Sequence, residues 1–378
     1  MRVAFYAPMK PPDHPVPSGD RRMARLLIAA LTHAGHEVEL ACRMVSRDGA
    51  GDPARQARLA GLGAALSERI VRRYGNRPPD LRPQAWLTYH LYYKAPDWLG
   101  PKVSLALGLP YLVAEASVAP KRAGGPWDQG HQAVLQALDQ AAAVITLNPA
   151  DKECLPAGTP KHDLKPFLDP VPYQLASGQR AVHRGTLAQR LALDAEVPWI
   201  AVAAMMRPGD KLASYRLLAR ALAELSDRPW CLLVAGDGPA RGEVSQALDS
   251  LGSDRVRLLG ALDEGRLAAL YGAADFMAWP AINEAYGMAL LEAQAAGLPV
   301  IAGATGGVPG ILRHEEGGLL VMPREASALA AAIDRLLGDS QLRGRLSRGA
   351  RAAVEREHSL AGAAAELDRI LRQAVGPS

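Results

Sequence analysis

Residues 276–302 read FMAWPAINEAYGMALLEAQAAGLPVIA, and this stretch decides the fold class. The apolar run Phe276–Trp279 has the length of a buried strand, and residues 285–296 have the composition of a mostly buried helix. Gly297 and Pro299 end that helix before a second apolar run that reaches residue 302. A strand, a helix and a strand joined this closely are typical of a crossover between parallel strands. The stretch therefore predicts an α/β protein with a doubly wound parallel sheet.

The same alternation extends through both halves of the chain. In the second half, strand-like runs at 199–205, 230–235, 256–259 and 319–321 alternate with helical patterns. In the first half, the run Val3–Ala7 precedes a helical pattern at 20–34 and an apolar run at 38–41. Prolines and glycines accumulate between 169 and 198. We therefore expect two Rossmann-like domains, residues 1–180 and 181–357, with the ligand beyond the carboxyl ends of the strands, in a cleft between the domains.

The composition excludes several classes of protein. The 378 residues are 49% hydrophobic and 22% charged, with a formal net charge of +4, which describes a globular chain. No aromatic-plus-basic module is evident, so we expect no nucleic-acid partner. Cys42, Cys154 and Cys231 lie far apart, which excludes a recognisable zinc ribbon, iron–sulfur site or disulfide scaffold. Scattered cysteines and a first apolar run too short for a signal peptide indicate a cytoplasmic protein without a membrane span.

The loop and helix after Trp279 carry groups suited to an anionic ligand. Glu284 lies in the loop, and Gly287 lets a ligand approach the backbone where the helix starts. The free N–H groups of Gly287, Met288 and Ala289 carry the positive end of the helix dipole, which suits a diphosphate. Glu292 follows about one and a half turns later, where a carboxylate can accept hydrogen bonds from ribose hydroxyls. Taken alone, Glu292 is better interpreted as a solvent-facing glutamate on an ordinary helix.

Further motifs surround these two glutamates in a fixed order. They are Arg207 and Lys211 after the first strand of the second domain, Gly236-Asp237-Gly238-Pro239, Val256-Arg257-Leu258-Leu259-Gly260, and Gly306-Gly307-Val308-Pro309. With Glu284 and Glu292 separated by seven residues, this order resembles family 4 of the retaining GT-B glycosyltransferases, which share an E-x7-E signature, a GxGP turn and a GGVPE motif. The resemblance covers residues 201–321. The first domain shares only the layout and the loop at 17–19 that contains Gly19.

The resemblance implies roles for individual residues. Arg207 and Lys211 would neutralise the donor diphosphate, which is the leaving group, and Glu284 would contact hydroxyls of the donor sugar, so these three are the candidate catalytic residues. Glu292 would bind the ribose. The other donor-binding candidates are Gly19, Gly236, Gly260, Ala261, Tyr286, Gly287, Met288, Ala289, Gly306 and Gly307. The resemblance also implies a last helix within 358–378 that packs back on the first domain.

The sequence departs from the family pattern at several positions. Family members often read Glu-Gly-Phe-Gly where residues 284–287 read EAYG, and Gly310 replaces the glutamate of GGVPE. A histidine often follows the fourth strand of the first domain, but the corresponding run at 111–118 contains none. The candidates for this acceptor-side position are Glu115, Ser117, His90 and His131, although a lone histidine is more often structural.

Basic residues concentrate in the first domain. Between Arg43 and Arg82 there are nine basic and four acidic residues, and this local surplus of +5 exceeds the net charge of +4 of the whole chain. A solvated helical face explains the surplus. A peripheral contact with an anionic membrane, or with an acidic acceptor, explains it as well.

These patterns lead to one expected function and two alternatives. We expect a retaining glycosyltransferase that moves a hexose-type sugar from a UDP- or GDP-sugar to a glycan, a lipid-linked acceptor or a small molecule. It would need no cofactor and no essential metal, because no Asp-x-Asp pair, Walker A motif or HExxH motif occurs. The first alternative is a GT-B nucleotide-sugar epimerase, whose acid/base residues we cannot locate. The second is a non-catalytic protein that binds sugar nucleotides or polyanions.

Overall fold

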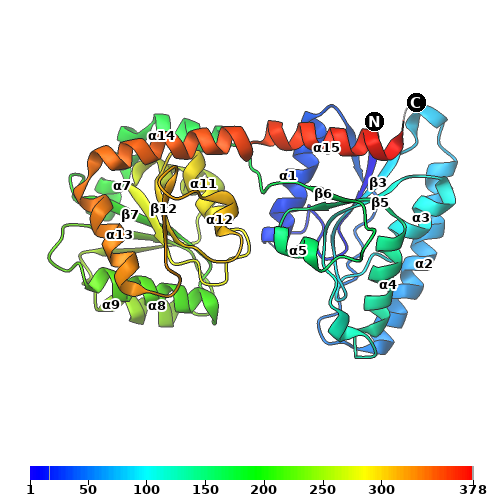
Figure 1. Cartoon of the computed structure of the whole chain (residues 1–378), viewed down its shortest axis with the longest axis horizontal. Coiled ribbons are helices and arrows are strands. Elements are labelled where there is room, and N and C mark those ends of the chain that lie inside the picture. The colour runs from blue at the N-terminus through cyan, green and yellow to red at the C-terminus, as the bar shows by residue number, and fades with distance from the viewer. Residues whose placement is uncertain (17, 377–378) are drawn as a thin grey trace. The chain divides into compact units, whose positions relative to one another are not determined.

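The computed structural model describes residues 1–16 and 18–376, and the chain forms two compact units (Figure 1). The first unit is Met1–Lys165 together with the last helix, α15 (Leu360–Val375), and the second unit is Pro166–Ser359. Each unit contains one six-stranded sheet whose strands are all parallel. The expected α/β class and the GT-B architecture of two doubly wound domains are therefore confirmed.

The first sheet has the strand order β2-β1-β3-β4-β5-β6. Its strands are β1 (Arg2–Tyr6), β2 (Glu37–Leu40), β3 (Ala85–Leu91), β4 (Tyr111–Ala116), β5 (Ala141–Thr146) and β6 (Lys161–Asp163). The central strands are almost continuous apolar runs, as expected for a parallel sheet that is covered on both faces.

Helices cover both faces of this sheet. They are α1 (Gly19–His33), α2 (Pro53–Gly75), α3 (Gly100–Leu107), α4 (Asp128–Asp139), α5 (Pro149–Glu153) and the short 3₁₀ helices η1 (Pro79–Leu81) and η2 (Pro120–Arg122). Ser18 and Asp52 cap α1 and α2, since their side chains accept N–H groups of the first helical turn. Helix α15 packs on α1, as Figure 1 shows, and Oδ1 of Asp368 on α15 lies 3.1 Å from Nε2 of His36.

The second sheet has the order β12-β11-β10-β7-β8-β9. Its strands are β7 (Trp199–Ala203), β8 (Cys231–Ala235), β9 (Val256–Gly260), β10 (Phe276–Trp279), β11 (Val300–Gly303) and β12 (Gly318–Val321). Its helices are α6 (Val171–Gly178), α7 (Arg180–Leu191), α8 (Asp210–Ala223), α9 (Arg241–Asp249), α10 (Glu264–Ala273), α11 (Met288–Ala295), α12 (Val308–Ile311), α13 (Ala326–Gly338) and α14 (Ser340–Glu357). No helix in the described part of the chain is both long enough and apolar enough to span a bilayer.

Residues 166–180 fold with the second unit, whereas the sequence had placed them in the first domain. Helices α6 and α7 pack against α10, and the rings of Tyr173 and Tyr271 lie 6.3 Å apart. Arg180 donates a hydrogen bond of 2.7 Å to Asp275. The accumulated prolines and glycines suggested a linker, but the aromatic and ionic contacts of this segment can only be seen once the chain is folded.

Candidate active site

In the second unit the strand order reverses between β7 and β10. The chain starts at β7, adds β8 and β9 on one side, and then crosses to β10 on the other side. Open parallel sheets bind ligands beyond the carboxyl ends of the strands beside such a switch point. Arg207 and Lys211 follow β7, and Glu284 follows β10. The fold therefore brings the three candidate catalytic residues to one edge of one sheet.

Lys211 and Glu284 are in direct contact. Lys211 lies in the first turn of α8, and its Nζ donates a hydrogen bond to Glu284 Oε2. The same oxygen accepts a bond of 3.4 Å from the indole Nε1 of Trp279, and the ammonium lies 5.6 Å from the centre of the Trp279 ring. The Lys211 and Glu284 side chains keep 30% and 17% of their exposure. Both charges are thus ordered and still open to a ligand.

Hydrogen bonds between α8 and the loop after β10 hold this pair in place. Asn283 Nδ2 donates to Asp210 Oδ1 at 3.0 Å, and the N–H of Ile282 donates to Ser214 Oγ at 3.1 Å. Asn283 and Ala281 have φ angles of 50° and 57°, in the left-handed region that costs energy for residues with a Cβ. Such strain persists where the surroundings fix the backbone, as they commonly do at functional sites.

Arg207 lies on the turn between β7 and α8, and its side chain is exposed. The turn is fixed by two hydrogen bonds of 2.9 Å, from the N–H of Met206 to the carbonyl of Asp237 and from the N–H of Ala240 to the carbonyl of Met206. Among the described residues, no acidic side chain pairs with the Arg207 guanidinium. Its charge is therefore available to an anion at this edge.

Glycines allow the loops at this edge to pack backbone against backbone. A Cβ on Gly236 would lie 2.0 Å from the carbonyl oxygen of Ala204, and a Cβ on Gly307 would lie 1.9 Å from that of Ala285. A Cβ on Gly306 would also lie within 2.1 Å of the loop after β10. Only glycine fits at such distances. The turns after β8 and β11 are therefore built against the loops that carry the candidate catalytic residues.

Helix α11 begins at the same edge, directly after Gly287. This glycine has a φ of 72°, and a Cβ on it would lie 2.9 Å from Leu290 Cδ1. The carbonyl of Gly287 accepts the N–H groups of Leu290 and Leu291. The N–H groups of Met288 and Ala289 come before these, and the first N–H groups of a helix have no intrahelical acceptor. This helix start is suited to phosphate oxygens.

Glu292 is buried inside the second unit. Its exposed fraction is 2%, and the hydroxyl of Tyr271 donates to its Oε2 at 3.5 Å. The interpretation of Glu292 as a solvent-facing glutamate is therefore wrong, because α11 is covered on all sides and its second half lies in the core. A buried carboxylate needs partners, and its expected role in ribose binding stays a prediction.

The remaining donor-side candidates of the second unit lie on loops of this edge. Gly260, with a φ of 71°, ends β9, and its carbonyl accepts the N–H of Gly236 at 2.8 Å. Ala261 follows it and is exposed, and Tyr286 is half-buried just before α11. The structure thus gathers the second-unit candidates along one sheet edge, with Glu292 deeper than the rest.

The first sheet has its own switch point between β1 and β3, and a charged pair lies there. Nδ1 of His90, near the carboxyl end of β3, is 3.0 Å from Oδ1 of Asp20, in the first turn of α1. The two side chains keep 22% and 24% of their exposure. Sequence patterns pointed to His90 but not to Asp20. The available signal was that Asp20 follows the loop after the first strand, next to the candidate Gly19.

Glu115 lies opposite His90 on the neighbouring strand. The ladder between β3 and β4 pairs the residues on either side of them. His90 has a φ of 64° and Glu115 a φ of 61°, so both backbones leave the extended conformation at the carboxyl end of the sheet. Two strained residues side by side at a switch point are typical of a functional site.

The charges at this edge shift the pKa values of neighbouring side chains. Burial lowers the pKa of His90, but the hydrogen bond to Asp20 and the negative charges of Glu115 and Asp151 outweigh it, so the pKa of His90 is raised. The bond to His90 in turn lowers the pKa of Asp20. Burial, with the charge of Glu115, raises the pKa of Asp151 on α5. We name Asp20, His90, Glu115 and Asp151 the acceptor-edge cluster.

The other first-unit candidates lie apart from these contacts. The N–H of Ser117 donates to the carbonyl of Leu91 at 3.0 Å, which fixes the loop after β4. His131 is buried in α4, and its Nδ1 has no hydrogen-bond partner among the described atoms. Gly19 is exposed at the start of α1, and a Cβ there would meet nothing within 4 Å. Among the described residues, no group of three or more histidine, cysteine or acidic side chains could hold a metal ion.

Residues 209–353 match the model of the family described as glycosyl transferases group 1. The chain is 33% identical over 240 residues to the D-inositol 3-phosphate glycosyltransferase of Xylanimonas cellulosilytica, an alignment that covers 62% of this chain and 55% of that protein. A protein of the same description from Jonesia denitrificans is 34% identical over 237 residues, covering 57% and 53%. The chain thus spans about half the length of the curated relatives it matches.

Solved structures share the fold over the whole chain. A glycosyltransferase from Rickettsia africae has a TM-score of 0.77 at 17% identity, covering 100% of this chain and 99% of that one. HepE from Anabaena, solved in complex with UDP-glucose, has a TM-score of 0.70 at 20% identity, covering 98% and 99%. At these identities the likeness concerns the fold alone. The chain therefore has the GT-B fold, and the part of its second unit at residues 209–353 is similar to the group 1 glycosyl transferases.

Proposed function

We propose that this glycosyltransferase transfers a hexose from a nucleoside diphosphate sugar, with retention of the anomeric configuration, to a hydroxyl group of its acceptor. The observation that carries the proposal is the pair of cations at the β7–β10 switch point. Lys211 is ordered against Glu284, and the Arg207 guanidinium has no acidic partner among the described residues. Together with the N-terminus of α11, they form a site for a diphosphate.

The chemistry follows from what the diphosphate becomes. When the bond between the anomeric carbon and the phosphate oxygen breaks, negative charge develops on the leaving phosphate. Fixed cations and N–H groups stabilise that charge more than the ground state, which accelerates the step. Arg207, Lys211 and the N–H groups of Met288 and Ala289 supply this stabilisation without an essential metal. Glu284 would exchange its bond with Lys211 for bonds with sugar hydroxyls when the donor binds.

We propose UDP- or GDP-sugars as donors. The fold neighbour HepE was solved with UDP-glucose, and the curated relatives are described as glycosyltransferases. The loop that contains Gly260 and Ala261 would lie near the base, Gly306 and Gly307 would line the nucleotide pocket, and Glu292 would bind the ribose. The burial of Glu292 supports this role, because a hydrogen bond between a ribose hydroxyl and a carboxylate is stronger in a buried environment than in water.

On the acceptor side we propose the acceptor-edge cluster. An imidazole among three carboxylates can bind acceptor hydroxyls and accept a proton near neutral pH. His90 and Glu115 would thus take the position of the histidine that family members carry after the fourth strand. The acceptor would be a glycan or a lipid-linked sugar.

A basic stripe on α2 supports a contact with an anionic membrane. Arg55, Arg58, Arg69 and Arg72 are exposed and recur at helical spacing, with Leu62 between them at 50% exposure. Arg43 and Arg77, by contrast, are paired with Asp13 and Glu39. Co-sedimentation with vesicles of anionic and neutral lipid would test the contact. Binding to anionic vesicles that is lost in the Arg69→Gln/Arg72→Gln variant is expected, and equal binding of both proteins would contradict it.

Thermal unfolding in the presence of UDP-, GDP- and ADP-sugars tests the donor proposal. A true donor at 100 times its Kd stabilises the protein by about 2.7 kcal/mol. Raised unfolding temperatures with release of nucleoside diphosphate support a transferase. A stabilised protein that never turns the donor over indicates the non-catalytic binder, and a changed sugar that remains on the nucleotide indicates the epimerase.

A further inference from the structure

The second unit has a pocket at the opposite edge of its sheet from the candidate active site. The pocket has a volume of about 250 Å³ and is lined by Ser177, Arg180, Asp275, Arg343, Ser347 and Arg351, among others. Asp275 directly precedes β10, whereas Glu284 follows β10. The length of the strand therefore separates this pocket, which we name the amino-edge pocket, from the diphosphate site.

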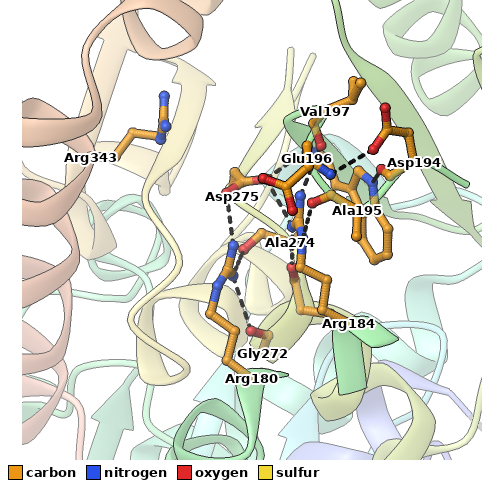
Figure 2. Close-up of polar contacts among 12 residues, drawn as sticks. Arg180, Arg184, Asp194, Ala195, Glu196, Val197, Gly272, Ala274, Asp275 and Arg343 are labelled. Atoms are coloured by element: carbon orange, nitrogen blue, oxygen red, sulfur yellow. Dashed lines mark hydrogen bonds and ion pairs between the residues drawn. The ribbon is translucent and has the colours of Figure 1, made fainter. Parts of the chain in front are cut away.

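Positive charge dominates the amino-edge pocket. Arg180, Arg343 and Arg351 line it, and Asp275 is its one acidic lining residue. That carboxylate is already engaged, as Figure 2 shows: it pairs with Arg180 at 2.7 Å and with Arg184 at 3.0 Å. It also accepts the N–H of Trp199 at 2.7 Å. Three lining arginines against one lining carboxylate, which Arg180 and Arg184 already engage, leave a surplus of positive charge in the pocket.

Two of these arginines come from one face of α14. Arg343, Ser347 and Arg351 recur every four residues and so form one ridge of the helix. Nη1 of Arg343 donates to carbonyls at the end of α13, at 3.2 Å for Leu337. Among the described residues, its other guanidinium nitrogens donate to no acceptor and it forms no ion pair. In Figure 2 its guanidinium lies apart from the bonded network around Asp275.

Arg351, on the same ridge of α14, and Arg180, at the start of α7, complete the set. Nη2 of Arg351 donates to Ser177 Oγ and, at 3.4 Å, to the carbonyl of Ala296 at the end of α11. Arg180 binds Asp275 and backbone carbonyls after α10, yet its side chain keeps 42% of its exposure. Burial lowers the pKa of Arg180; the charge and hydrogen bond of Asp275 oppose this shift, and the charges of Arg184 and Arg343 add to it, so the pKa stays lowered. The like charges at this pocket therefore repel one another, which an anion would relieve.

We infer that the amino-edge pocket binds the phosphate group of a small phosphorylated metabolite. Guanidinium groups bind phosphate through two parallel N–H bonds, and Ser177 and Ser347 add hydroxyl groups at the rim. The volume of about 250 Å³ leaves room for a phosphate group with a small attached moiety. This site is separate from the proposed donor site, and it stands whether or not the donor proposal holds.

Calorimetric titration with inorganic pyrophosphate at low ionic strength tests the inference. Because the donor site also attracts a diphosphate, the titration is made with full-length Arg207→Ala/Lys211→Ala protein. Retained binding in this background is expected. Adding Arg343→Gln/Arg351→Gln should weaken the affinity for pyrophosphate at least tenfold, since two of the phosphate-binding guanidinium groups are lost. The matched control Arg345→Gln/Arg348→Gln removes the same charge from exposed positions of α14 outside the pocket and should change the affinity less than twofold.

Two results would overturn the inference. One is loss of all pyrophosphate binding in the Arg207→Ala/Lys211→Ala background. The other is equal weakening by the pocket and control variants, which would indicate a non-specific charge effect. If the Arg343→Gln/Arg351→Gln variant fails to fold, hydrogen exchange of the Arg207→Ala/Lys211→Ala protein shows whether pyrophosphate binds in the amino-edge pocket. Pyrophosphate should then slow exchange in residues 175–181 and 343–351, and unchanged exchange there would refute the site.

Discussion

Lys211 donates a hydrogen bond to Glu284, although the two residues lie 73 positions apart in the chain. They follow the two strands that flank the switch point of the second sheet, so this contact marks where the fold creates a polar site. A charge pair that keeps part of its exposure can exchange its partners for ligand groups. The contact therefore links the fold to the proposed donor chemistry.

Removing the Lys211 charge should impair the chemical step. Lys211→Ala leaves the developing charge on the leaving phosphate with one cation fewer, so kcat should fall about 10²–10³-fold. The check is steady-state release of nucleoside diphosphate. Arg216→Ala is the matched control, because Arg216 is an exposed cation on the same helix, outside the site. A similar loss in both variants would contradict the assignment.

Adding a Cβ at Gly307 should damage the donor site, whereas Gly310 should tolerate one. In Gly307→Ala the new Cβ would lie 1.9 Å from the carbonyl of Ala285, so the loop after β10 must shift. A Cβ on Gly310 would meet nothing within 4 Å. We expect the donor Kd, measured by calorimetry, to rise at least tenfold for Gly307→Ala and to stay within twofold for Gly310→Ala. Unchanged donor affinity in Gly307→Ala would show that this turn does not shape the site.

Much of the fold could be predicted because the crossover pattern at 276–302 recurs along the chain. The site of the second unit followed from motifs that each lie after a strand. The apolar composition of residues 285–296 predicted a mostly buried helix, but the pattern alone could not show what Glu292 contacts inside it. Asp20 and Asp151 were missed for a related reason. Each stands alone in sequence, and only the sheet brings them to His90.

The Asp20–His90 contact should set the pH dependence of the acceptor edge. The pKa of His90 is raised, so its contribution to stability is complete below the unfolded value of about 6.5 and is lost as the pH rises through the folded value. The pKa of Asp20 is lowered, so its contribution is present above about 3.9 and is lost at lower pH. The pair therefore stabilises the fold most between these two pH values.

Asp20→Asn should lower the pKa of His90, because the carboxylate that bonds to its imidazolium is gone. NMR titration of the His90 ring proton resonances measures this shift. Asp80→Asn, at an exposed position of η1, serves as the control and should leave the resonance titrating as in the wild type. A His90 pKa that is the same in all three proteins would show that the contact carries no charge coupling.

Asp275 should be important for the stability of the second unit. Its carboxylate binds two guanidinium groups and a backbone N–H at 15% exposure, so Asp275→Ala leaves two partly buried guanidinium groups without their acidic partner. We expect the free energy of unfolding to fall by about 3 kcal/mol in urea denaturation. Asp334→Ala breaks a more exposed pair with Arg228 and should cost less than about 1 kcal/mol. Equal losses would contradict the distinction between the two pairs.

We propose that the cations at the β7–β10 switch point activate a nucleoside diphosphate leaving group. The decisive measurement is the rate at which the wild-type protein releases nucleoside diphosphate from UDP- and GDP-hexoses, compared with the Arg207→Ala/Lys211→Ala variant. We expect release from at least one donor by the wild type and a fall of at least 10²-fold in the variant. Equal rates in the two proteins, or no release from any donor by the wild type, would contradict it.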